Sequence, residues 1–171
     1  EGADREIKTI RGVIIAAAGV GRRMKADRPK QLLVLDGTPI LIYTLRKFDS
    51  CGVVDHIVVA APHESVDEIR QMVSQAGFKK PVTVVEGGER RQDSVWIAMQ
   101  QLQPDTSIVA VHHAVRPFVS VEEIDSVVAE ADRRGQRPPA LAVVRLAHPR
   151  GRGVRPGRRP VHGAADAGED T

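Results

Sequence analysis

Strand-forming segments alternate with helix-forming segments along residues 13–133, and this alternation constrains the fold more than any other feature of the chain. Apolar, β-branched runs of strand length occur at Val13–Ala18, His56–Ala61, Val82–Glu86 and Ile108–His112. Helical spacing of apolar residues is found at Pro39–Asp49, Ser65–Ala76, Ser94–Gln101 and Val121–Arg133. Strands and helices in this order predict an α/β fold, with a mostly parallel sheet covered by helices on both faces.

The regular pattern predicts one domain over residues 1–144, with a different segment after it. Ser120 and Glu123 form a capping-box pattern ahead of the last predicted helix, and a fifth strand is predicted at Ala140–Val144. Residues 145–171 have no apolar periodicity and are predicted to be disordered. All lysines lie at or before Lys80, whereas this tail consists mostly of Arg, Pro, Gly and Ala. We therefore weigh two origins for the tail, out-of-frame translation and a genuine basic extension.

A loop of small residues follows the first predicted strand. Residues 16–31 read Ala-Ala-Ala-Gly-Val-Gly-Arg-Arg-Met-Lys-Ala-Asp-Arg-Pro-Lys-Gln. Gly19 and Gly21 permit turns that aim backbone N–H groups at phosphate oxygens, and Arg23 and Lys30 can neutralise the phosphates. The pattern indicates a site for a nucleoside triphosphate, and the alternative is a solvated basic loop between a strand and a helix.

Two other phosphate-binding patterns do not fit this loop. A dinucleotide fingerprint requires a third small residue after Gly-x-Gly-x-x, where this chain has Met24. A Walker loop requires Gly-Lys followed by Ser or Thr, and that sequence is absent. A nicotinamide-dependent dehydrogenase is therefore disfavoured.

Composition and charge indicate the cellular location of the chain and the kinds of partner that it can bind. Cys51 is the single cysteine, which suits a reducing cytoplasm, and we expect it to be a small buried side chain near a helix end. The chain has no apolar run of about 18 residues, and its polar first residues are unlike a secretory signal, so we expect no membrane contact and a cytoplasmic location. Residues 133–171 hold 9 Arg against 3 acidic residues, whereas residues 1–132 hold 16 basic and 19 acidic residues. Because the basic tail has no aromatic residue, we expect no nucleic-acid partner.

Three stretches, in order, resemble the motifs of one enzyme family. The first is the loop at 16–31, the second reads Gly-Gly-Glu-Arg-Arg-Gln-Asp-Ser-Val at 87–95, and the third reads His-His-Ala-Val-Arg-Pro-Phe-Val at 112–119. Together they resemble the sugar-phosphate nucleotidyltransferases, most closely the 2-C-methyl-D-erythritol 4-phosphate cytidylyltransferases. The resemblance implies a Rossmann-like three-layer nucleotidyltransferase fold. It also implies transfer of a cytidylyl group from CTP to 2-C-methyl-D-erythritol 4-phosphate, with release of pyrophosphate, in isoprenoid precursor biosynthesis.

The resemblance also implies roles for individual residues. Arg23 and Lys30 match the catalytic cations that stabilise the charge of the transition state. The nucleotide-binding positions of the family match Ala17, Ala18, Gly19, Gly21, Gly88, Ser94 and Arg116. Of these, the backbone of Ala17, Ala18 and Gly88 and the hydroxyl of Ser94 match the positions that hold cytosine.

The residues of the second and third motifs also have plain structural interpretations. The pair Gly87-Gly88 can be a simple turn, with Ser94 as a helix N-cap. Arg91 and Asp93 are interpreted as braces of that turn. Arg116 can be an ordinary surface arginine in an exposed loop.

The third motif departs from the family at one position. The family has Asp where this chain has His113, next to His112. Adjacent strand residues point to opposite faces, so the two imidazoles are not expected to bind one metal ion, and we assign no protein metal ligand. Imidazole is a poor ligand for Mg²⁺, which prefers oxygen. The resemblance implies Mg²⁺ as cofactor, and we expect it to be bound mainly through the CTP triphosphate.

The family's C-terminal part is not recognisable after about residue 135–145. In the family this part supplies the acceptor site and an arm that joins the two subunits of a homodimer. Four functions therefore remain open. They are the cytidylyltransferase acting on methylerythritol phosphate, a sister enzyme acting on ribitol 5-phosphate, a nucleotide-binding remnant without turnover, and the disfavoured dehydrogenase. The substrates expected for the first are CTP and a sugar-alcohol phosphate.

Overall fold

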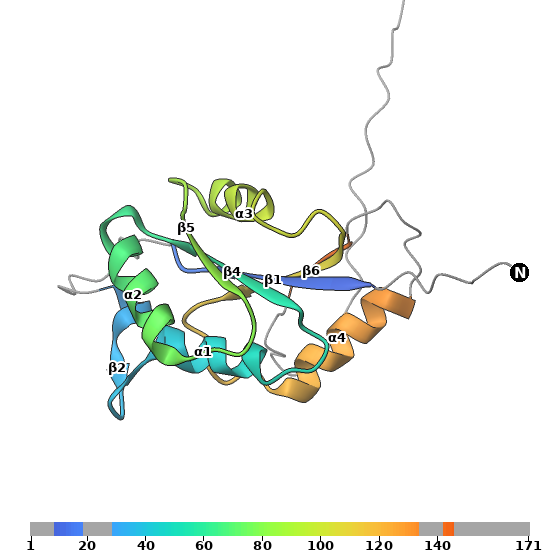
Figure 1. Ribbon diagram of the computed structural model, residues 1–171, viewed down its shortest axis with the longest axis horizontal. Helices are drawn as coiled ribbons and strands as arrows, with labels where there is room; N and C mark the ends of the chain where they lie inside the picture. The colour runs from blue at the N-terminus through green and yellow to red at the C-terminus, as the bar shows by residue number, and fades with distance from the viewer. Residues whose placement is uncertain (1–8, 19–28, 134–141, 146–171) are drawn as a thin grey trace, which may run out of the picture.

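A five-stranded parallel sheet runs through the middle of the molecule (Figure 1). The computed structural model describes residues 9–18, 29–133 and 142–145. In the order β5-β4-β1-β6-β7, each strand is parallel to its neighbours. The strands are β1 (Ile10–Ala16), β4 (His56–Ala61), β5 (Val82–Glu86), β6 (Thr106–His113) and β7 (Ala142–Arg145). The predicted parallel sheet and its five strands are thus confirmed, and the tail at 146–171 lies outside the described residues.

Helices cover both faces of the sheet and make three layers. Helix α3 (Arg91–Met99) lies on one face, and α1 (Ile40–Asp49), α2 (Val66–Ala76) and α4 (Val121–Arg133) lie on the other (Figure 1). All four helices were predicted, and α4 has the predicted bounds. The three-layer arrangement implied by the resemblance is confirmed.

Alternation along the central strands builds a separate core on each face. Val13 and Ile15 of β1 pack in the larger core with buried residues of α1, including Phe48. Ile14, between them, packs in the smaller core with Ala98 of α3. Both faces of the central strands are therefore apolar, as a parallel sheet covered on both sides requires.

The start of α3 differs from the prediction. The helix begins at Arg91, so Ser94 lies within its first turn and is not the N-cap, which is Arg90. The Asp93 carboxylate accepts a hydrogen bond from the Arg90 N–H at 3.3 Å, which confirms Asp93 as a brace of this turn. The apolar spacing begins only at Val95, after the polar first turn, which is why the periodicity placed the helix start too late.

The start of α4 confirms the capping box. Ser120 N–H donates to the Glu123 carboxylate at 2.9 Å, and Glu123 N–H donates to Ser120 Oγ at 3.1 Å. These two bonds satisfy N–H groups that have no partner within the helix.

A small hairpin is present in addition to the predicted elements. Strands β2 (Val34–Leu35) and β3 (Thr38–Pro39) are antiparallel and follow the short 3-10 helix η1 (Lys30–Leu32). Asp36 and Gly37 join them with φ of 49° and 79°. Positive φ at both central residues is the requirement of a tight type I′ turn, which Asp-Gly meets well.

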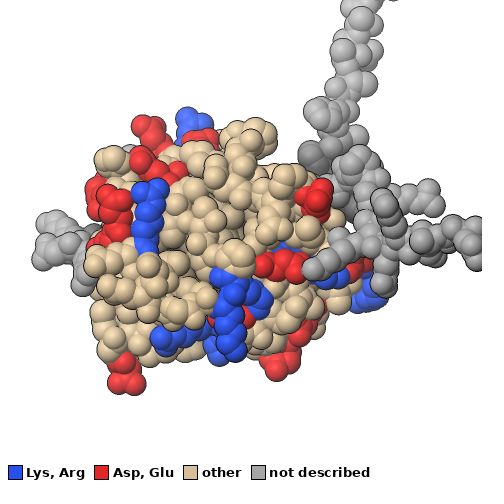
Figure 2. Space-filling view, viewed as in Figure 1, with Lys and Arg blue, Asp and Glu red and all other residues tan. Residues whose placement is uncertain are grey.

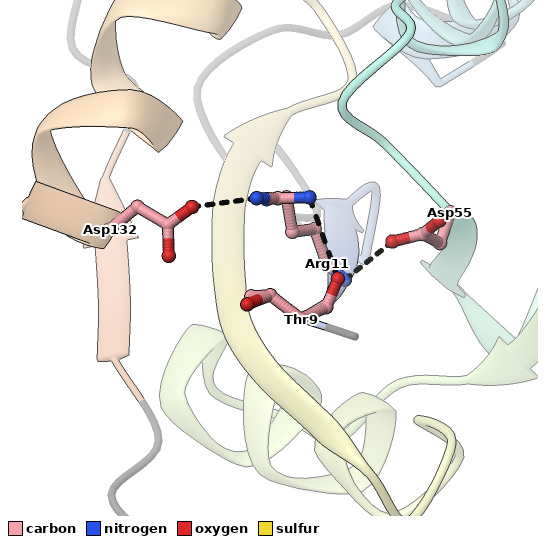
Figure 3. A network of polar contacts seen from close by, with 4 residues as sticks. All are labelled: Thr9, Arg11, Asp55 and Asp132. Atoms are coloured by element: carbon pink, nitrogen blue, oxygen red, sulfur yellow. Dashed lines mark hydrogen bonds and ion pairs between the residues drawn. The ribbon is translucent and has the colours of Figure 1, made fainter. Parts of the chain in front are cut away.

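Arg11 ties three elements together at the amino ends of the strands (Figure 3). Its backbone N–H donates to Asp55 Oδ2 at 2.8 Å, just before β4. Its guanidinium pairs with Asp132 of α4 at 2.6 Å and also donates to the Thr9 carbonyl at 3.5 Å. The contacts of Arg11 therefore hold β1, the start of β4 and α4 together at the amino edge of the sheet.

His56 is buried at the same end of β4. The residue is 4% exposed, and its Nε2 accepts a hydrogen bond from Gln103 N–H at 3.4 Å. Its Nδ1 is buried and has no hydrogen-bond partner among the described residues. Burial lowers the pKa of His56 below its ordinary value, although nearby Asp55 acts in the opposite direction.

We expect this histidine to make the fold less stable in mild acid. Because the pKa of His56 is lower in the folded chain than in the unfolded chain, the unfolded chain binds the extra proton more readily. The contribution of His56 to the free energy of unfolding should be constant above about pH 7 and fall below the unfolded pKa of about 6.5, by at most about 1.4 kcal/mol per pH unit. Urea unfolding at several pH values measures this, and His56→Phe is expected to reduce the slope. Equal slopes in His56→Phe and the parent chain would contradict the assignment.

Candidate nucleotide-binding site

The carboxyl ends of β1 and β6 meet where the chain reverses its order across the sheet. From β1 the chain moves through β4 to β5, and it then returns to form β6 and β7 on the other side of β1. Ala114 N–H, just after β6, donates to the Ala16 carbonyl at the end of β1 at 3.2 Å. Ligands of open parallel sheets bind at this kind of switch point. As predicted, all three motifs start at this edge.

The backbone of Ala17 is held from both sides. Its N–H donates to the Ala60 carbonyl at 2.8 Å, and its carbonyl accepts a hydrogen bond from Gln31 Nε2 at 2.8 Å. Ala17 and Gln31 are each only 3% exposed. These two bonds hold the backbone of Ala17 in place, and so they also set the position of Ala18 at the carboxyl edge of the sheet. Contact of either residue with a base stays a prediction.

The first and second motifs meet at Gly87. A Cβ atom at this position would lie 2.5 Å from Ala18 Cβ and 2.7 Å from Ser94 Oγ. Only a residue without a side chain allows such an approach. The Gly87 N–H also donates to the Ala61 carbonyl at 2.8 Å, which fixes the turn to the end of β4. Three predicted site residues, Ala18, Gly88 and Ser94, are therefore brought together around Gly87.

Ser94 is buried and lies over the glycine turn. Its Oγ is within hydrogen-bond distance of the Gly88 carbonyl at 3.2 Å and of the Arg90 carbonyl at 3.1 Å. A hydroxyl has one proton to donate to these carbonyls, and its oxygen can also accept. The hydroxyl therefore braces the turn at the start of α3.

Lys30 lies at the other end of the small-residue loop. It is the first residue of η1 and is exposed, and its neighbour Gln31 makes the hydrogen bond to Ala17. This bond brings the start of η1 to the end of β1 across 14 residues of sequence. Lys30 is therefore held near the same edge as Ala18. The predicted site residues Gly19, Gly21 and Arg23 lie outside the described residues.

Arg116 lies in the turn that follows β6, and its side chain is exposed. Its backbone N–H donates to the His113 carbonyl at 3.2 Å. Its carbonyl lies 2.9 Å from His112 Nε2. The structure places Arg116 at the switch point, where an exposed guanidinium could meet a bound phosphate.

His112 and His113 face opposite sides of the sheet, as predicted. His112 is 3% exposed and its ring lies against Phe48 of α1, whereas His113 is the next residue along β6 and is partly exposed. Glu86, a carboxylate at this edge, pairs with His63 at 2.9 Å. In the part of the chain that the structure describes, no group of three or more His, Cys, Asp or Glu side chains is placed to hold a metal ion. These donors do not form a Mg²⁺ site by themselves, since the ion prefers several oxygen ligands.

Charged side chains are dispersed over the visible surface. On the face shown in Figure 2, basic and acidic side chains form small groups separated by uncharged surface. Within the described ranges, no helix has both the length and the hydropathy needed to cross a lipid bilayer.

Cys51 is buried just after α1, as predicted, and its thiol donates to Asp125 Oδ1 at 3.0 Å. Burial, with help from Asp125, raises the pKa of this thiol to about 11, so it is not a nucleophile at neutral pH.

Sequence reasoning missed the contacts that support the site. Gln31 was included in the loop pattern without a role, and nothing in its spacing indicated the bond to Ala17. Thr44 of α1 was missed as well, although its hydroxyl donates to the Ala114 carbonyl at 2.8 Å. Thr44 shares the helical spacing of the apolar residues Leu41, Leu45 and Phe48, and a polar residue on such a face is the signal that could have identified it.

Comparison with known proteins agrees with the motifs. The model of the 2-C-methyl-D-erythritol 4-phosphate cytidylyltransferase family matches residues 12–146. A relative of that name from Symbiobacterium thermophilum is 44% identical over 125 residues, which are 72% of this chain and 51% of the relative. Another from Solibacter usitatus is 42% identical over 130 residues, with 72% and 53% covered. The chain spans about half the length of the curated relatives it matches.

Solved structures show the same fold. The 4-diphosphocytidyl-2C-methyl-D-erythritol synthase of Anaerococcus prevotii superposes with a TM-score of 0.63 at 22% identity, covering 73% of this chain and 52% of that one. The bifunctional IspDF protein of Campylobacter jejuni superposes with a TM-score of 0.60 at 24% identity, covering 73% and 31%. At this identity the likeness supports the nucleotidyltransferase fold.

Proposed function

This chain belongs to the 2-C-methyl-D-erythritol 4-phosphate cytidylyltransferase family, and on that premise we propose that its carboxyl edge binds CTP for cytidylyl transfer. The acceptor in this proposal is 2-C-methyl-D-erythritol 4-phosphate, and pyrophosphate is released. The observation that carries the proposal is the contact of Ala18, Gly87 and Ser94 beside the switch point. This contact joins the first and second motifs at the carboxyl edge, where the loop that contains Arg23 and Lys30 begins.

The chemistry of this contact suits a cytosine ring. Glycine at 87 and 88 lets the side chains of Ala18, Ser94 and Asp93 lie close against the main chain of the turn, which brings the two motifs together. Cytosine carries one amino donor, which the Ser94 oxygen can accept, and it carries acceptors that backbone N–H groups can satisfy. A hydrogen-bonding site of this kind discriminates strongly, because a wrong base leaves buried polar groups unpaired.

The proposed reaction is a displacement at the α-phosphorus of CTP. An ionised phosphate oxygen of the acceptor forms a bond to this phosphorus while the bond to the bridging oxygen of pyrophosphate breaks. The nucleophile is already an anion, so no general base is required. Catalysis then consists of positioning and of cations aimed at the developing negative charge. We assign these roles to Lys30 and Arg23, with Arg116 as a contact to the nucleotide.

We propose that Mg²⁺ enters this site as part of the nucleotide substrate. The described donors do not form a metal site, and His113 has an imidazole where the family has an aspartate. Oxygen ligands would therefore come mainly from the triphosphate and from water.

His113→Asp should strengthen the binding of CTP in the presence of Mg²⁺. The substitution supplies an anionic oxygen that the ion prefers over a ring nitrogen. Calorimetric titration of both chains with CTP, with Mg²⁺ and with EDTA, measures the effect. A gain confined to the Mg²⁺ titration is expected. If the two chains bound CTP equally well both with Mg²⁺ and with EDTA, position 113 would not contact the ion.

A nucleotide-binding protein without turnover is the second candidate. The observation that favours it is His113, which has an imidazole where the family has an aspartate. Ribitol 5-phosphate is the alternative acceptor. We propose a cytoplasmic setting, which the lone reduced cysteine supports.

Pyrophosphate release tests the proposed function. The full chain is incubated with CTP, Mg²⁺ and either 2-C-methyl-D-erythritol 4-phosphate or ribitol 5-phosphate, and a no-acceptor reaction is the control. Release with the first acceptor only is the expected result. Release with ribitol 5-phosphate alone would reassign the acceptor, and CTP binding without release would favour the second candidate.

A further inference from the structure

His112 is a buried histidine whose ring orientation is fixed by the core. It lies one residue before the end of β6 and is 3% exposed. Its ring packs against that of Phe48, with centroids 5.3 Å apart and planes inclined at 57°. Phe48 itself is fully buried in the larger core. The direction of the imidazole N–H groups is therefore set by packing.

The fixed ring makes a hydrogen bond to the turn above it. His112 Nε2 lies 2.9 Å from the Arg116 carbonyl. A carbonyl oxygen can only accept, so Nε2 carries a proton and donates it. This bond joins the His112 ring to the turn that follows β6. Within the same turn, the Arg116 N–H donates a hydrogen bond to the His113 carbonyl at 3.2 Å.

Side-chain burial does little to hold most of this turn in place. Val115 is 43% exposed and Phe118 is 80% exposed, and Arg116 is exposed as well. Ala114 is buried, and its backbone is bonded to Ala16 and Thr44. Between the buried residues Ala114 and Val119, the conformation therefore depends on hydrogen bonds, one of which His112 makes to the Arg116 carbonyl.

We propose that His112 is a positioning residue for Arg116 in nucleotide binding. By donating its Nε2 proton to the Arg116 carbonyl, it fixes the backbone from which the guanidinium reaches the phosphates. His112 does not touch the nucleotide itself. This inference rests on the proposed function, in which Arg116 contacts the nucleotide.

A double-mutant cycle measured by CTP titration tests the coupling. His112→Phe keeps a ring against Phe48 and removes the donor, and Arg116→Ala removes the guanidinium. A hydrogen bond contributes about 0.5–1.5 kcal/mol, so His112→Phe should weaken CTP binding by about 2- to 13-fold. In the Arg116→Ala background the same change should have no further effect, because no guanidinium remains to be positioned.

Several outcomes would overturn the inference. One is CTP affinity in His112→Phe equal to that of the parent chain, and another is the same loss in both backgrounds, which a merely structural role would give. If the parent chain binds no CTP, the proposed function fails first and this inference falls with it.

A spectroscopic measurement on the unaltered chain does not depend on the folding of any variant. In ¹⁵N-labelled protein above the pH at which the ring is charged, we expect the His112 imidazole as the Nε2–H tautomer, with slow exchange of that proton. A neutral Nδ1–H tautomer would overturn the inference, because that ring could not donate to Arg116.

Discussion

Gly87→Ala should weaken CTP binding by about 5- to 150-fold. The new Cβ would lie 2.5 Å from Ala18 Cβ and 2.7 Å from Ser94 Oγ, so the end of β1 or the start of α3 must move. Overpacking of this kind costs about 1–3 kcal/mol, and about 1.4 kcal/mol corresponds to a tenfold change in affinity. Calorimetric titration with CTP and Mg²⁺ measures the loss, and thermal unfolding shows how much stability is lost with it.

Gly52→Ala is the matched control for this experiment. Gly52 is exposed, its φ is not in the left-handed region, and a Cβ there would meet nothing within 4 Å. It should bind CTP as the parent chain does. If Gly87→Ala also bound CTP with the parent affinity, the contact around Gly87 would not be part of the nucleotide site.

Lys30→Ala should slow pyrophosphate release by about 10²–10³-fold while changing CTP affinity by only a few fold. The reason is that a cation aimed at the developing charge stabilises the transition state more than the bound substrate, and removing one such group typically costs this much. Steady-state rates together with CTP titrations separate the two effects.

Lys47→Ala provides the comparison for charge alone. Lys47 is an exposed lysine in the last turn of α1, on another element. Its substitution should leave both the rate and the affinity unchanged. An equal fall in rate and affinity in Lys30→Ala would instead assign Lys30 to ground-state binding, and an unchanged rate would remove it from the mechanism.

The layers and the parallel sheet could be predicted because hydrophobic periodicity reports directly on burial. The run at His56–Ala61 is apolar on both faces, and its observed bounds equal the predicted ones. The hairpin around Asp36-Gly37 was not predicted, because its two-residue strands are too short to show alternation. The start of α3 was placed too late because polar residues fill its first turn.

The candidate site could be predicted in part. The motifs indicated Ala18, Gly88 and Ser94, and the structure places these residues together around Gly87. The bond between Gln31 and Ala17 could not be predicted, because it joins the two ends of a loop and depends on the path of the chain in space. The bond from His112 to Arg116 depends in the same way on how the ring packs against Phe48.

Calorimetric titration of the full chain with CTP and Mg²⁺, alongside ATP and NAD, tests most directly the claim that the carboxyl edge between β1 and β6 is a CTP site. Selective binding of CTP is expected, weakened in the Gly87→Ala variant and retained in the Gly52→Ala variant. A folded chain that binds none of the three nucleotides, or that binds ATP or NAD as well as CTP, would contradict it.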